Sequence, residues 1–340
     1  MDEKVLLGHG SGGTMMKRLI DEVFFDAYAG DELRRGDDAA VLPPLSADAR
    51  LAFSTDSFVV SPHFFPGGDI GRLAVCGTVN DVATCGAKPL YLSCGFVLEE
   101  GYPMDDLRRI CRSMAEAAQE AGVKLVTGDT KVVNRGHGDG VYINTSGVGE
   151  IAPEVNLSGA FCKPGDAVLV SGTLGDHGIT IMSCRESLSF SADVRSDAAP
   201  LNHLIADVLA AAPDVRCFRD PTRGGLASTL NELAGQSGVS IEIEEEAIPV
   251  RDAVRGACDM LGYDPLQVAN EGKMVCVVAA DQANAALEAM RSSAYGKDAA
   301  IIGAVAEFDE RRGPAVFVRN AFGGRRILDM LVGEQLPRIC

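Results

Sequence analysis

A cysteine occupies the last position of the sequence, in Pro337-Arg338-Ile339-Cys340. A thiol at this position is free to enter another site, and an exposed cysteine is a liability for oxidation that a protein with no use for it is expected to lack. The segment from Gly333 spans at most about 27 Å when extended, enough to reach a cleft in the same subunit or in a neighbour. We therefore expect this tail to carry a substrate and to deliver it. The alternative is a mobile chain end without a role.

Short carboxylates recur in the first half of the chain beside glycines, small residues and turns. They are Asp38 after Gly36-Asp37, Asp56 after Ser54-Thr55, Asp81 after Asn80, and Asp129 after Gly128. A single aspartate in such a place usually forms a turn or caps a helix. Several together offer the hard oxygen ligands that Mg²⁺ prefers. In combination with a glycine-rich loop, they indicate a site for a metal-bound nucleotide.

Two glycine-containing segments offer backbone amides to phosphate groups. The first, Gly8-His9-Gly10-Ser11-Gly12-Gly13, is suited to wrapping phosphate oxygens. It lacks the lysine of a P-loop and the preceding strand of a dinucleotide fingerprint, so a flexible N-terminal segment is the alternative. The second, Asp220-Pro221-Thr222-Arg223-Gly224-Gly225, stands directly before a predicted helix and combines amides, a cation and a carboxylate. Its alternative is a capped helix start.

Composition limits the class of protein. The chain has 340 residues, 46% of them hydrophobic, which is enough for two domains with a core each. A formal net charge of −17 argues against nucleic acid and anionic lipid as partners. The charged N-terminus and the lack of a long apolar run predict neither a signal peptide nor a membrane span, so we expect a cytoplasmic protein. The ten cysteines contain no C-x-x-C pair, which disfavours zinc or iron–sulfur ligation and fits small buried side chains in a reducing compartment.

The elements that must position these residues are predicted from periodicity and from helix stop signals. In the first half we expect helices at 69–85 and 105–121, ended by Gly86 and Gly122 respectively. Strands are expected at 51–60, 91–97, 123–127 and 141–148. In the second half the pattern predicts strands at 167–171, 274–279 and 300–305, and helices at 224–236 and 281–292. This order of strands and helices indicates an α+β or α/β protein.

A hinge is expected at Lys163-Pro164-Gly165-Asp166, where polar and turn-forming residues separate the two halves. We therefore predict an N-terminal ATP-binding and dimerisation domain at 1–160, a C-terminal domain at 161–308, and a C-terminal segment at 309–340 that ends in the mobile cysteine tail.

Six short motifs and the last four residues carry a family resemblance. The motifs resemble, in this order, those of the ATP-binding superfamily of aminoimidazole ribonucleotide synthetase: residues 9–13, 36–40, 54–57, 79–83, 128–131 and 220–225. With Pro337-Arg338-Ile339-Cys340 the chain is similar, over essentially its whole length, to the carbamoyl dehydratases of NiFe-hydrogenase maturation. The resemblance implies two α+β domains, in which the N-terminal sheet forms a barrel across a homodimer and the C-terminal domain is an α/β sandwich.

The resemblance also implies a reaction. A partner carbamoyltransferase, HypF, would load a carboxamide onto Cys340, and the chain would dehydrate it to a thiocyanate with ATP and Mg²⁺. The cyanide would then pass to iron on a HypC–HypD complex. By match to the family, the residues expected to contact the nucleotide are Gly10, Ser11, Gly12, Gly13, Asp38, Asp56, Asn80, Asp81, Asp129, Thr130 and Thr222. Candidate metal ligands are Asp38, Asp56, Asp81 and Asp220, in an order that the sequence leaves open.

Two further residues are implied as catalytic. Lys131 and Glu271 match the family positions proposed to remove the two N–H protons of the carboxamide. Lys131 can act as a base only if its neutral form is accessible, and otherwise it would brace phosphate as a cation. Glu271 requires desolvation to raise its pKa towards neutrality, and its alternative is a solvated carboxylate in a turn.

Three other functions remain open at this stage. A selenophosphate synthetase of the same superfamily would place a cysteine or selenocysteine near its N-terminus, whereas the earliest cysteine here is Cys76. A small-molecule kinase of the same fold would have no use for Cys340. A non-catalytic thiol carrier would have no use for the aspartate clusters.

Overall fold

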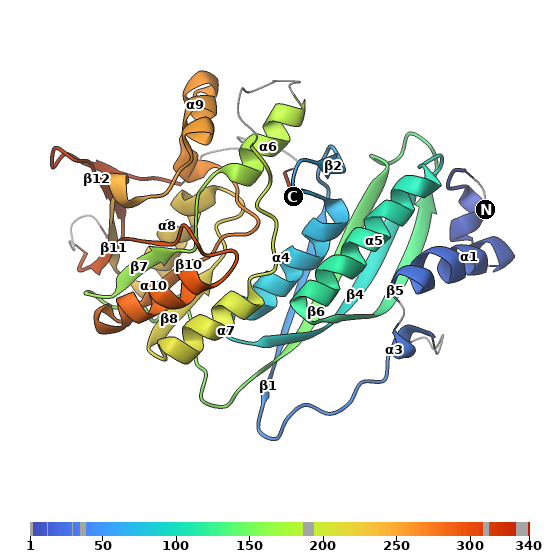
Figure 1. Ribbon diagram of the computed structural model, residues 1–340, viewed down its shortest axis with the longest axis horizontal. Coiled ribbons are helices and arrows are strands. Elements are labelled where there is room, and N and C mark those ends of the chain that lie inside the picture. The colour runs from blue at the N-terminus through green and yellow to red at the C-terminus, as the bar shows by residue number, and fades with distance from the viewer. Residues whose placement is uncertain are drawn as a thin grey trace.

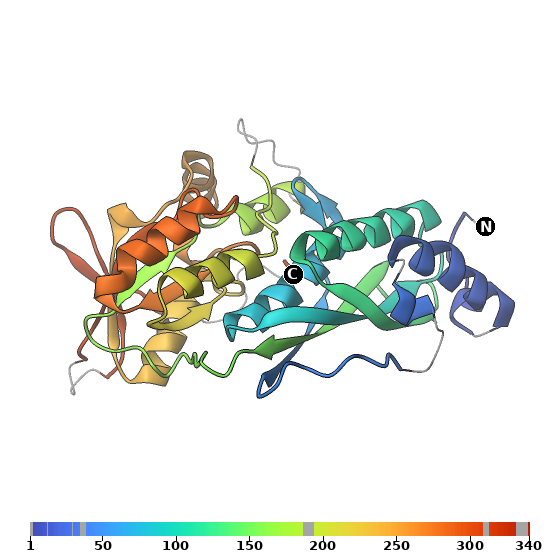
Figure 2. The ribbon, with the colours of Figure 1, turned by 60° about the horizontal axis from the view of Figure 1, so that its bottom comes forward.

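The computed structural model describes residues 3–11, 13–28, 30–34, 39–185, 194–308, 313–330 and 339–340. Two sheets dominate it, one in each half of the chain, and each is covered by helices (Figures 1 and 2). The fold is therefore the expected two-domain α+β arrangement. Among the described residues, no helix has the length and apolar character needed to cross a membrane.

The first sheet has four strands in the order β1-β6-β4-β5. These strands are β1 (Arg50–Phe58), β4 (Lys88–Glu99), β5 (Lys124–Val133) and β6 (Val141–Ile151). All neighbours are antiparallel except β4 and β5, which are parallel. The short pair β2 (Phe64–Phe65) and β3 (Gly68–Asp69) leads into the first long helix.

Helices α4 (Ile70–Thr84) and α5 (Met104–Ala121) cover one face of this sheet (Figure 1). Asp69 caps α4 by accepting hydrogen bonds from the backbone N–H groups of Gly71 and Arg72, and Gly122 ends α5 with φ 72°. The opposite face is open in the single chain, where Leu51 and Phe53 are 60% and 66% exposed. The barrel expected across a homodimer lies outside what one chain displays and stays a prediction.

The N-terminal segment packs over β5. It comprises η1 (Leu7–Gly10), α1 (Gly13–Leu19), the π-helical turn η2 (Ile20–Phe25), α2 (Asp26–Tyr28) and α3 (Asp31–Arg34). Its apolar side chains Leu19, Val23 and Phe24 belong to the same core as buried side chains of the first sheet, α4 and α5.

The second sheet has seven strands in the order β13-β12-β9-β11-β7-β10-β8. They are β7 (Ala167–Val170), β8 (Val215–Arg219), β9 (Ser240–Glu244), β10 (Val275–Val278), β11 (Ala300–Ala306), β12 (Val316–Arg319) and β13 (Arg325–Ile327). The last two strands lie in the segment 309–340. Strands β7 and β10 are buried along their whole length because helices cover both faces of the sheet.

Helices α7 (Asn202–Ala211) and α10 (Ala283–Ser292) pack on one face of the second sheet, and α8 (Gly225–Ser237) packs on the other. Helices α6 (Asp176–Arg185) and α9 (Asp252–Leu261) pack against each other. Single 3-10 turns connect elements of this half at Glu245–Ala247, Pro265–Gln267 and Ala280–Gln282.

Candidate functional site

A cavity of about 380 Å³ contains the thiol of Cys340. In both views the C-terminal end of the chain lies between the two halves, beside α4 (Figures 1 and 2). The cavity is lined by Thr55, Asp56, Gly77, Asp81, Arg219, Asp220, Thr222, Arg223, Thr229, Glu232, Glu271 and Cys340. Six residues predicted from the sequence therefore meet here: Cys340, Glu271, Asp56, Asp81, Asp220 and Thr222.

The last two residues lie inward, against their own chain. The side chain of Ile339 is 4% exposed and belongs to the core of the N-terminal half. The backbone N–H of Val59 donates to the Cys340 carbonyl oxygen at 3.0 Å. Burial raises the pKa of the Cys340 thiol to about 12, with a further contribution from Glu271. The thiol in this position is therefore protonated and a poor nucleophile.

Glu271 is buried, with 4% of its surface exposed, and its Oε1 atom has no hydrogen-bond partner. Its loop is held by Asn270, whose side-chain amide donates to the carbonyl of Pro221 at 2.9 Å and whose Oδ1 accepts from Gly175 N–H at 2.7 Å. Burial raises the pKa of Glu271 well above its ordinary value, and the charges of Asp220, Asp197, Asp56 and Asp81 raise it further. The desolvation that the sequence analysis required of this residue is thus present.

The three aspartates of the cavity come from three different elements. Asp56 lies on β1, Asp81 on α4, and Asp220 directly after β8. Burial and the charge of Asp220 raise the pKa of Asp81 to about 7, while Ser54 Oγ donates to its Oδ2 at 2.9 Å. Burial also raises the pKa of Asp220. Carboxylates crowded in this way are stabilised by a cation.

Mg²⁺ fits this donor set when it is shared with a nucleotide. No group of three His, Cys, Asp or Glu side chains in the described part of the chain could hold a metal ion alone. Mg²⁺ is usually bound by one or two carboxylates, with phosphate oxygens and water completing its shell. Five carboxylates and two guanidinium groups line the cavity, so a polyphosphate would meet net repulsion there without such a cation.

The predicted phosphate-binding turn before α8 borders the same cavity through Thr222 and Arg223. Gly224 occupies the N-cap position of α8 with φ 74° and provides no side-chain cap. Gly225 follows at φ 59°, and a Cβ atom there would lie 2.6 Å from the carbonyl oxygen of Val268. The α8 N-terminus can therefore offer backbone N–H groups to an anion, as helix N-termini commonly do.

Asn80 is buried beside the cavity but is not part of its lining. Its side-chain amide donates to the carbonyl of Ala199 at 3.0 Å, and its Oδ1 accepts from the N–H of Leu201 at 2.7 Å. These contacts join α4 to the segment before α7. The structure gives Asn80 a role in holding the two halves together, and its predicted nucleotide contact remains a prediction.

The other predicted site residues lie elsewhere in the single chain. Lys131 is 62% exposed on β5 and contacts Asp129 at 2.7 Å across the open face of the first sheet. Strands β6 and β4 separate β5 from β1, so β5 lies about 14 Å from the Asp56 strand. Gly10 packs against Val132 of β5, and Ser11 Oγ donates to the Leu7 carbonyl.

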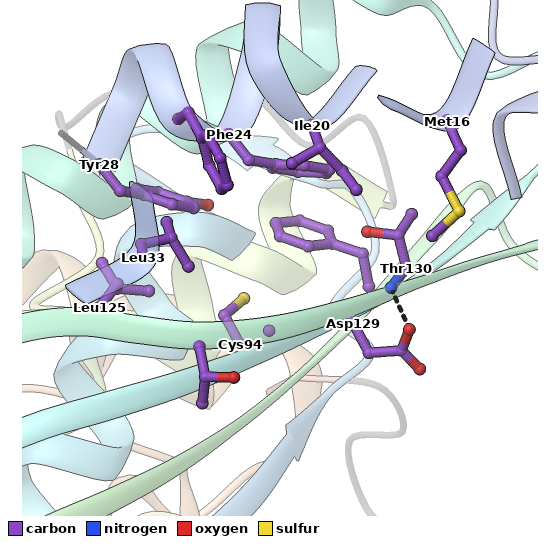
Figure 3. A pocket seen from close by; sticks show the side chains of 13 residues that line it. Met16, Ile20, Phe24, Tyr28, Leu33, Cys94, Leu125, Asp129 and Thr130 are labelled. Carbon is purple, nitrogen blue, oxygen red and sulfur yellow. Dashed lines mark hydrogen bonds between the residues drawn. The ribbon is translucent and has the colours of Figure 1, made fainter. Parts of the chain in front are cut away.

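Thr130 and Asp129 border a different, mostly apolar pocket of about 100 Å³ (Figure 3). In this view Ile20, Phe24 and Tyr28 of the N-terminal helices lie opposite Cys94 and Leu125 of the sheet. Asp129 accepts a hydrogen bond from the backbone N–H of Thr130 at 2.8 Å. The single chain thus divides the predicted site between two places. Gly13 is exposed, with φ 80°, and the predictions for Gly12 and Asp38 lie outside the described residues.

Sequence reasoning missed several residues of the cavity. Arg219 and Glu232 contact each other at its wall, and neither stands in a recognisable motif. The sequence indicates Thr55 only as a neighbour of Asp56 and not as a site residue. Outside the lining, His177 has its Nε2 atom 2.8 Å from the carbonyl oxygen of Ile339, the residue before the cysteine. Only the tertiary structure brings these side chains to the thiol.

Family models match both halves of the chain. The model described as "AIR synthase related protein, N-terminal domain" matches residues 36–151, and the model of the C-terminal domain of the same family matches residues 163–312. Together they cover most of the chain, including every described lining residue of the cavity except Cys340.

Curated relatives and solved structures show to which members of this family the chain is similar in sequence and fold. Carbamoyl dehydratase HypE from Azotobacter vinelandii is 57% identical over 334 residues, which are 98% of this chain and 96% of that protein. A crystal structure of the hydrogenase maturation protein HypE in complex with ATP is 51% identical, with a TM-score of 0.94 over 98% of this chain and 99% of that one. A HypE–HypF complex contains a chain that is 50% identical, with a TM-score of 0.80 over 92% of this chain and 99% of that one. The chain belongs to the HypE family, the hydrogenase-maturation carbamoyl dehydratases among the AIR synthase related proteins.

Proposed function

We propose that this chain dehydrates an S-carboxamide on Cys340 to an S-cyanate with consumption of ATP. The observation that carries the proposal is the position of the Cys340 thiol, in one cavity with Glu271 and with Asp56, Asp81 and Asp220. A carboxamide on this sulfur would lie among groups suited to removing protons and to holding a metal-bound triphosphate. The relative solved with ATP supports the choice of nucleotide.

The chemistry needs ATP because the oxygen of an amide is a poor leaving group. Transfer of the γ-phosphoryl group to that oxygen releases ADP and makes a phosphate ester. The C–O bond then breaks, and its electron pair leaves with phosphate. The two N–H protons are removed, and the C–N bond becomes the triple bond of the thiocyanate. The products are S-cyanate, ADP and phosphate.

Glu271 is the group in the cavity suited to accept a proton. Its high pKa means that its carboxylate, once deprotonated, is a stronger base than an exposed glutamate. Mg²⁺ held with the nucleotide near Asp56, Asp81 and Asp220 would favour that deprotonated form and neutralise charge on the triphosphate. Thr222, Arg223 and the α8 N-terminus would contact phosphate, in line with their position at the cavity.

Carbamoylation of Cys340 requires the tail to take a different position from the one observed. A thiol whose pKa is raised to about 12 is a poor nucleophile, so carbamoylation requires Cys340 to leave the cavity. We assign that step to HypF, in line with the HypE–HypF complex of the relative. Delivery of cyanide to a HypC–HypD complex, in the cytoplasm, completes the proposed sequence.

Lys131 enters the proposal through a homodimer. The open face of the first sheet carries Leu51, Phe53 and Val97 as exposed apolar side chains, which a second copy would cover. Strands β1 and β5 are the two edges of that sheet. In a barrel closed by two copies, pairing of β5 with the partner's β1 would bring Asp129, Thr130 and Lys131 to the neighbouring cavity. Lys131 would act there as a base or as a phosphate clamp.

Intact-mass measurement tests the reaction. After incubation with HypF, carbamoyl phosphate and ATP, the chain is expected to gain a carboxamide and then to lose the mass of one water. Cys340→Ala should show neither change and should bind ATP normally, because alanine removes only the sulfur and keeps the backbone contact with Val59. A Cys340→Ala chain that still passes through both masses would refute the proposal. ATP turnover with selenide or with a small-molecule acceptor would instead favour the rival functions.

A further inference from the structure

The last two residues are held by contacts from both halves of the chain. Val59, just after β1, donates its N–H to the Cys340 carbonyl oxygen at 3.0 Å. His177, in the first turn of α6, has its Nε2 atom 2.8 Å from the Ile339 carbonyl oxygen. The Ile339 side chain lies in the core, while Cys340 lines the cavity. If the tail moved by one residue along its path, Ile339 would face the cavity and Cys340 would no longer do so.

The structure around His177 fixes which ring nitrogen carries the proton. Its Nδ1 atom is 2.8 Å from Ser196 Oγ, and that same Oγ accepts a hydrogen bond from the N–H of Ala198 at 3.2 Å. The Ser196 hydroxyl therefore has its own proton to donate to Nδ1. A carbonyl oxygen can only accept, so Nε2 must donate to Ile339. In the neutral ring, Nδ1 then has no proton and accepts from the Ser196 hydroxyl.

The ring has no freedom to take another position. His177 is fully buried, and Phe65 packs edge-on against it with ring centroids 5.7 Å apart. Burial lowers the pKa of His177, which keeps the ring neutral near pH 7. A fully buried, oriented N–H group that points at the tail backbone is a costly arrangement unless the tail occupies that place.

We propose that His177 is a positioning residue that holds the tail in the dehydration position, by donating from Nε2 to the Ile339 carbonyl and thereby placing the sulfur of Cys340 in the cavity beside Glu271. This inference rests on the proposed function for its catalytic consequence. Its structural part, that His177 retains the tail inward, is independent of any reaction.

Three substitutions separate the hydrogen bond from general packing. His177→Gln keeps an N–H donor and an acceptor for Ser196 in a side chain of similar reach. His177→Met fills similar space but has no donor. Ser196→Ala leaves the ring and removes the hydroxyl that contacts its Nδ1 atom, together with the hydrogen bond from the N–H of Ala198. His203→Met is the matched control, because His203 makes a comparable ring-to-carbonyl contact with Glu120 at the surface, at 3.1 Å.

The first readout is access to the thiol. Cys85 is exposed and Cys184 half-buried, whereas the seven other cysteines besides Cys340 are buried. In a Cys85→Ser, Cys184→Ser background, intact mass after a bulky maleimide thus reports Cys340. Loss of one hydrogen bond should raise the alkylation rate about three- to tenfold in His177→Met. Ser196→Ala should show a smaller rise, and His177→Gln and His203→Met should match the parent.

The second readout separates positioning from loading. Carbamoylation by HypF, which uses the outward tail, should be as fast or faster in His177→Met, whereas loss of water from the loaded chain should slow and ATP affinity should stay unchanged. Parent-like alkylation and dehydration in both His177→Met and Ser196→Ala would overturn the proposal. The proposal would also be overturned if His177→Gln and His177→Met had equal thermal stability and lost the same fraction of the dehydration rate. If the loaded parent fails to lose water while the alkylation series behaves as expected, the proposed function fails and the retention of the tail stands.

Discussion

At the scale of single residues, the carboxyl groups that line the cavity repel one another. Glu271 is buried close to the three half-buried aspartates, and the two described arginines of the lining, Arg219 and Arg223, do not balance the carboxylates. Such an arrangement destabilises the ligand-free protein and is relieved when a cation enters. Perturbed groups of this kind gather at functional sites, and the cost to the fold is characteristic of such sites.

Replacing Glu271 by glutamine should stabilise the ligand-free protein at neutral pH. Because its pKa is raised in the native state, native Glu271 keeps a proton that the unfolded chain releases. Stability is therefore lost as the pH rises above the ordinary carboxyl pKa, about 4.3, towards the raised value. The free energy of unfolding of Glu271→Gln, measured by denaturant titration without Mg²⁺ or nucleotide, should exceed that of the parent increasingly from pH 5 to pH 7.

Glu116→Gln provides the control for this series, because Glu116 is exposed on α5. The difference in free energy of unfolding between Glu116→Gln and the parent should not change with pH. Glu271→Gln should also stop the loss of water from the carbamoylated chain. A variant that is no more stable than the parent at pH 7 would show that the Glu271 carboxyl is not perturbed in the folded protein.

Replacing Asp81 by asparagine should remove metal-dependent turnover without unfolding the chain. Asparagine can still accept the hydrogen bond from Ser54, and it removes a buried charge that repels Asp220. The thermal midpoint should therefore be unchanged or higher, while ATP hydrolysis at limiting Mg²⁺ should fall on the order of tenfold or more. Normal hydrolysis across a Mg²⁺ titration would remove Asp81 from the site.

At the scale of elements, short-range packing decides where the site residues point. Neighbouring positions on α4 separate two tasks: Asn80 holds the segment before α7, and Asp81 faces the cavity. The turn before α8 can approach its neighbours only because it is built of glycine. Gly225 lies against the carbonyl oxygens of Val268 and Leu266, in the loop that carries Glu271.

Two glycines of α8 should respond to alanine in opposite ways. Gly225→Ala adds a Cβ atom 2.6 Å from the Val268 carbonyl oxygen at a φ of 59°, which should destabilise the protein by about 2 kcal/mol or more and weaken ATP binding. Gly235→Ala lies in the exposed helix interior with no atom within 4 Å, so it should stabilise by about 0.5–1 kcal/mol. Thermal and denaturant unfolding would measure both. Similar effects from the two substitutions would contradict the steric account.

At the scale of the whole molecule, one chain contains the parts of the proposed site but does not assemble them. The thiol cavity lies between the two halves, whereas Lys131 lies on the far edge strand of the open sheet. A second copy over that face would both cover Phe53 and complete the site, which is the reason that we propose a homodimer.

Mixed dimers test whether Lys131 serves the neighbouring chain. Lys131→Ala and Cys340→Ala should each be inactive alone. If Lys131 acts across the dimer, a co-expressed dimer with one protomer of each kind has one intact site, and the Cys340-containing protomer should lose the mass of water after loading. Dehydration should reach up to about half of the parent rate per dimer, since one of two sites is restored. An inactive mixed dimer, with confirmed composition, would place Lys131 in the site of its own chain, and an active Lys131→Ala homodimer would place it outside the site.

The sequence by itself determined the local elements and the chemical types at the site. The helix predicted at 105–121 is observed at 104–121, because its apolar spacing and Gly122 act within a few turns. The strand predicted at 51–60 is observed at 50–58 for the same reason. In contrast, the strand predicted at 123–127 continues to Val133, because pairing with β4 extends through the motif around Asp129.

Only the tertiary structure decided which of the predicted residues meet. Asp56, Asp81, Asp220, Glu271 and Cys340 are far apart in the sequence and line one cavity, whereas Asp129 and Lys131 belong to similar motifs and lie elsewhere. The order β1-β6-β4-β5, which puts β5 at an edge, depends on long-range strand pairing that no local pattern encodes. The contact of His177 with Ile339 likewise spans 162 positions. Periodicity and capping act over a few residues, but a site between two halves is fixed by burial and pairing across the whole chain.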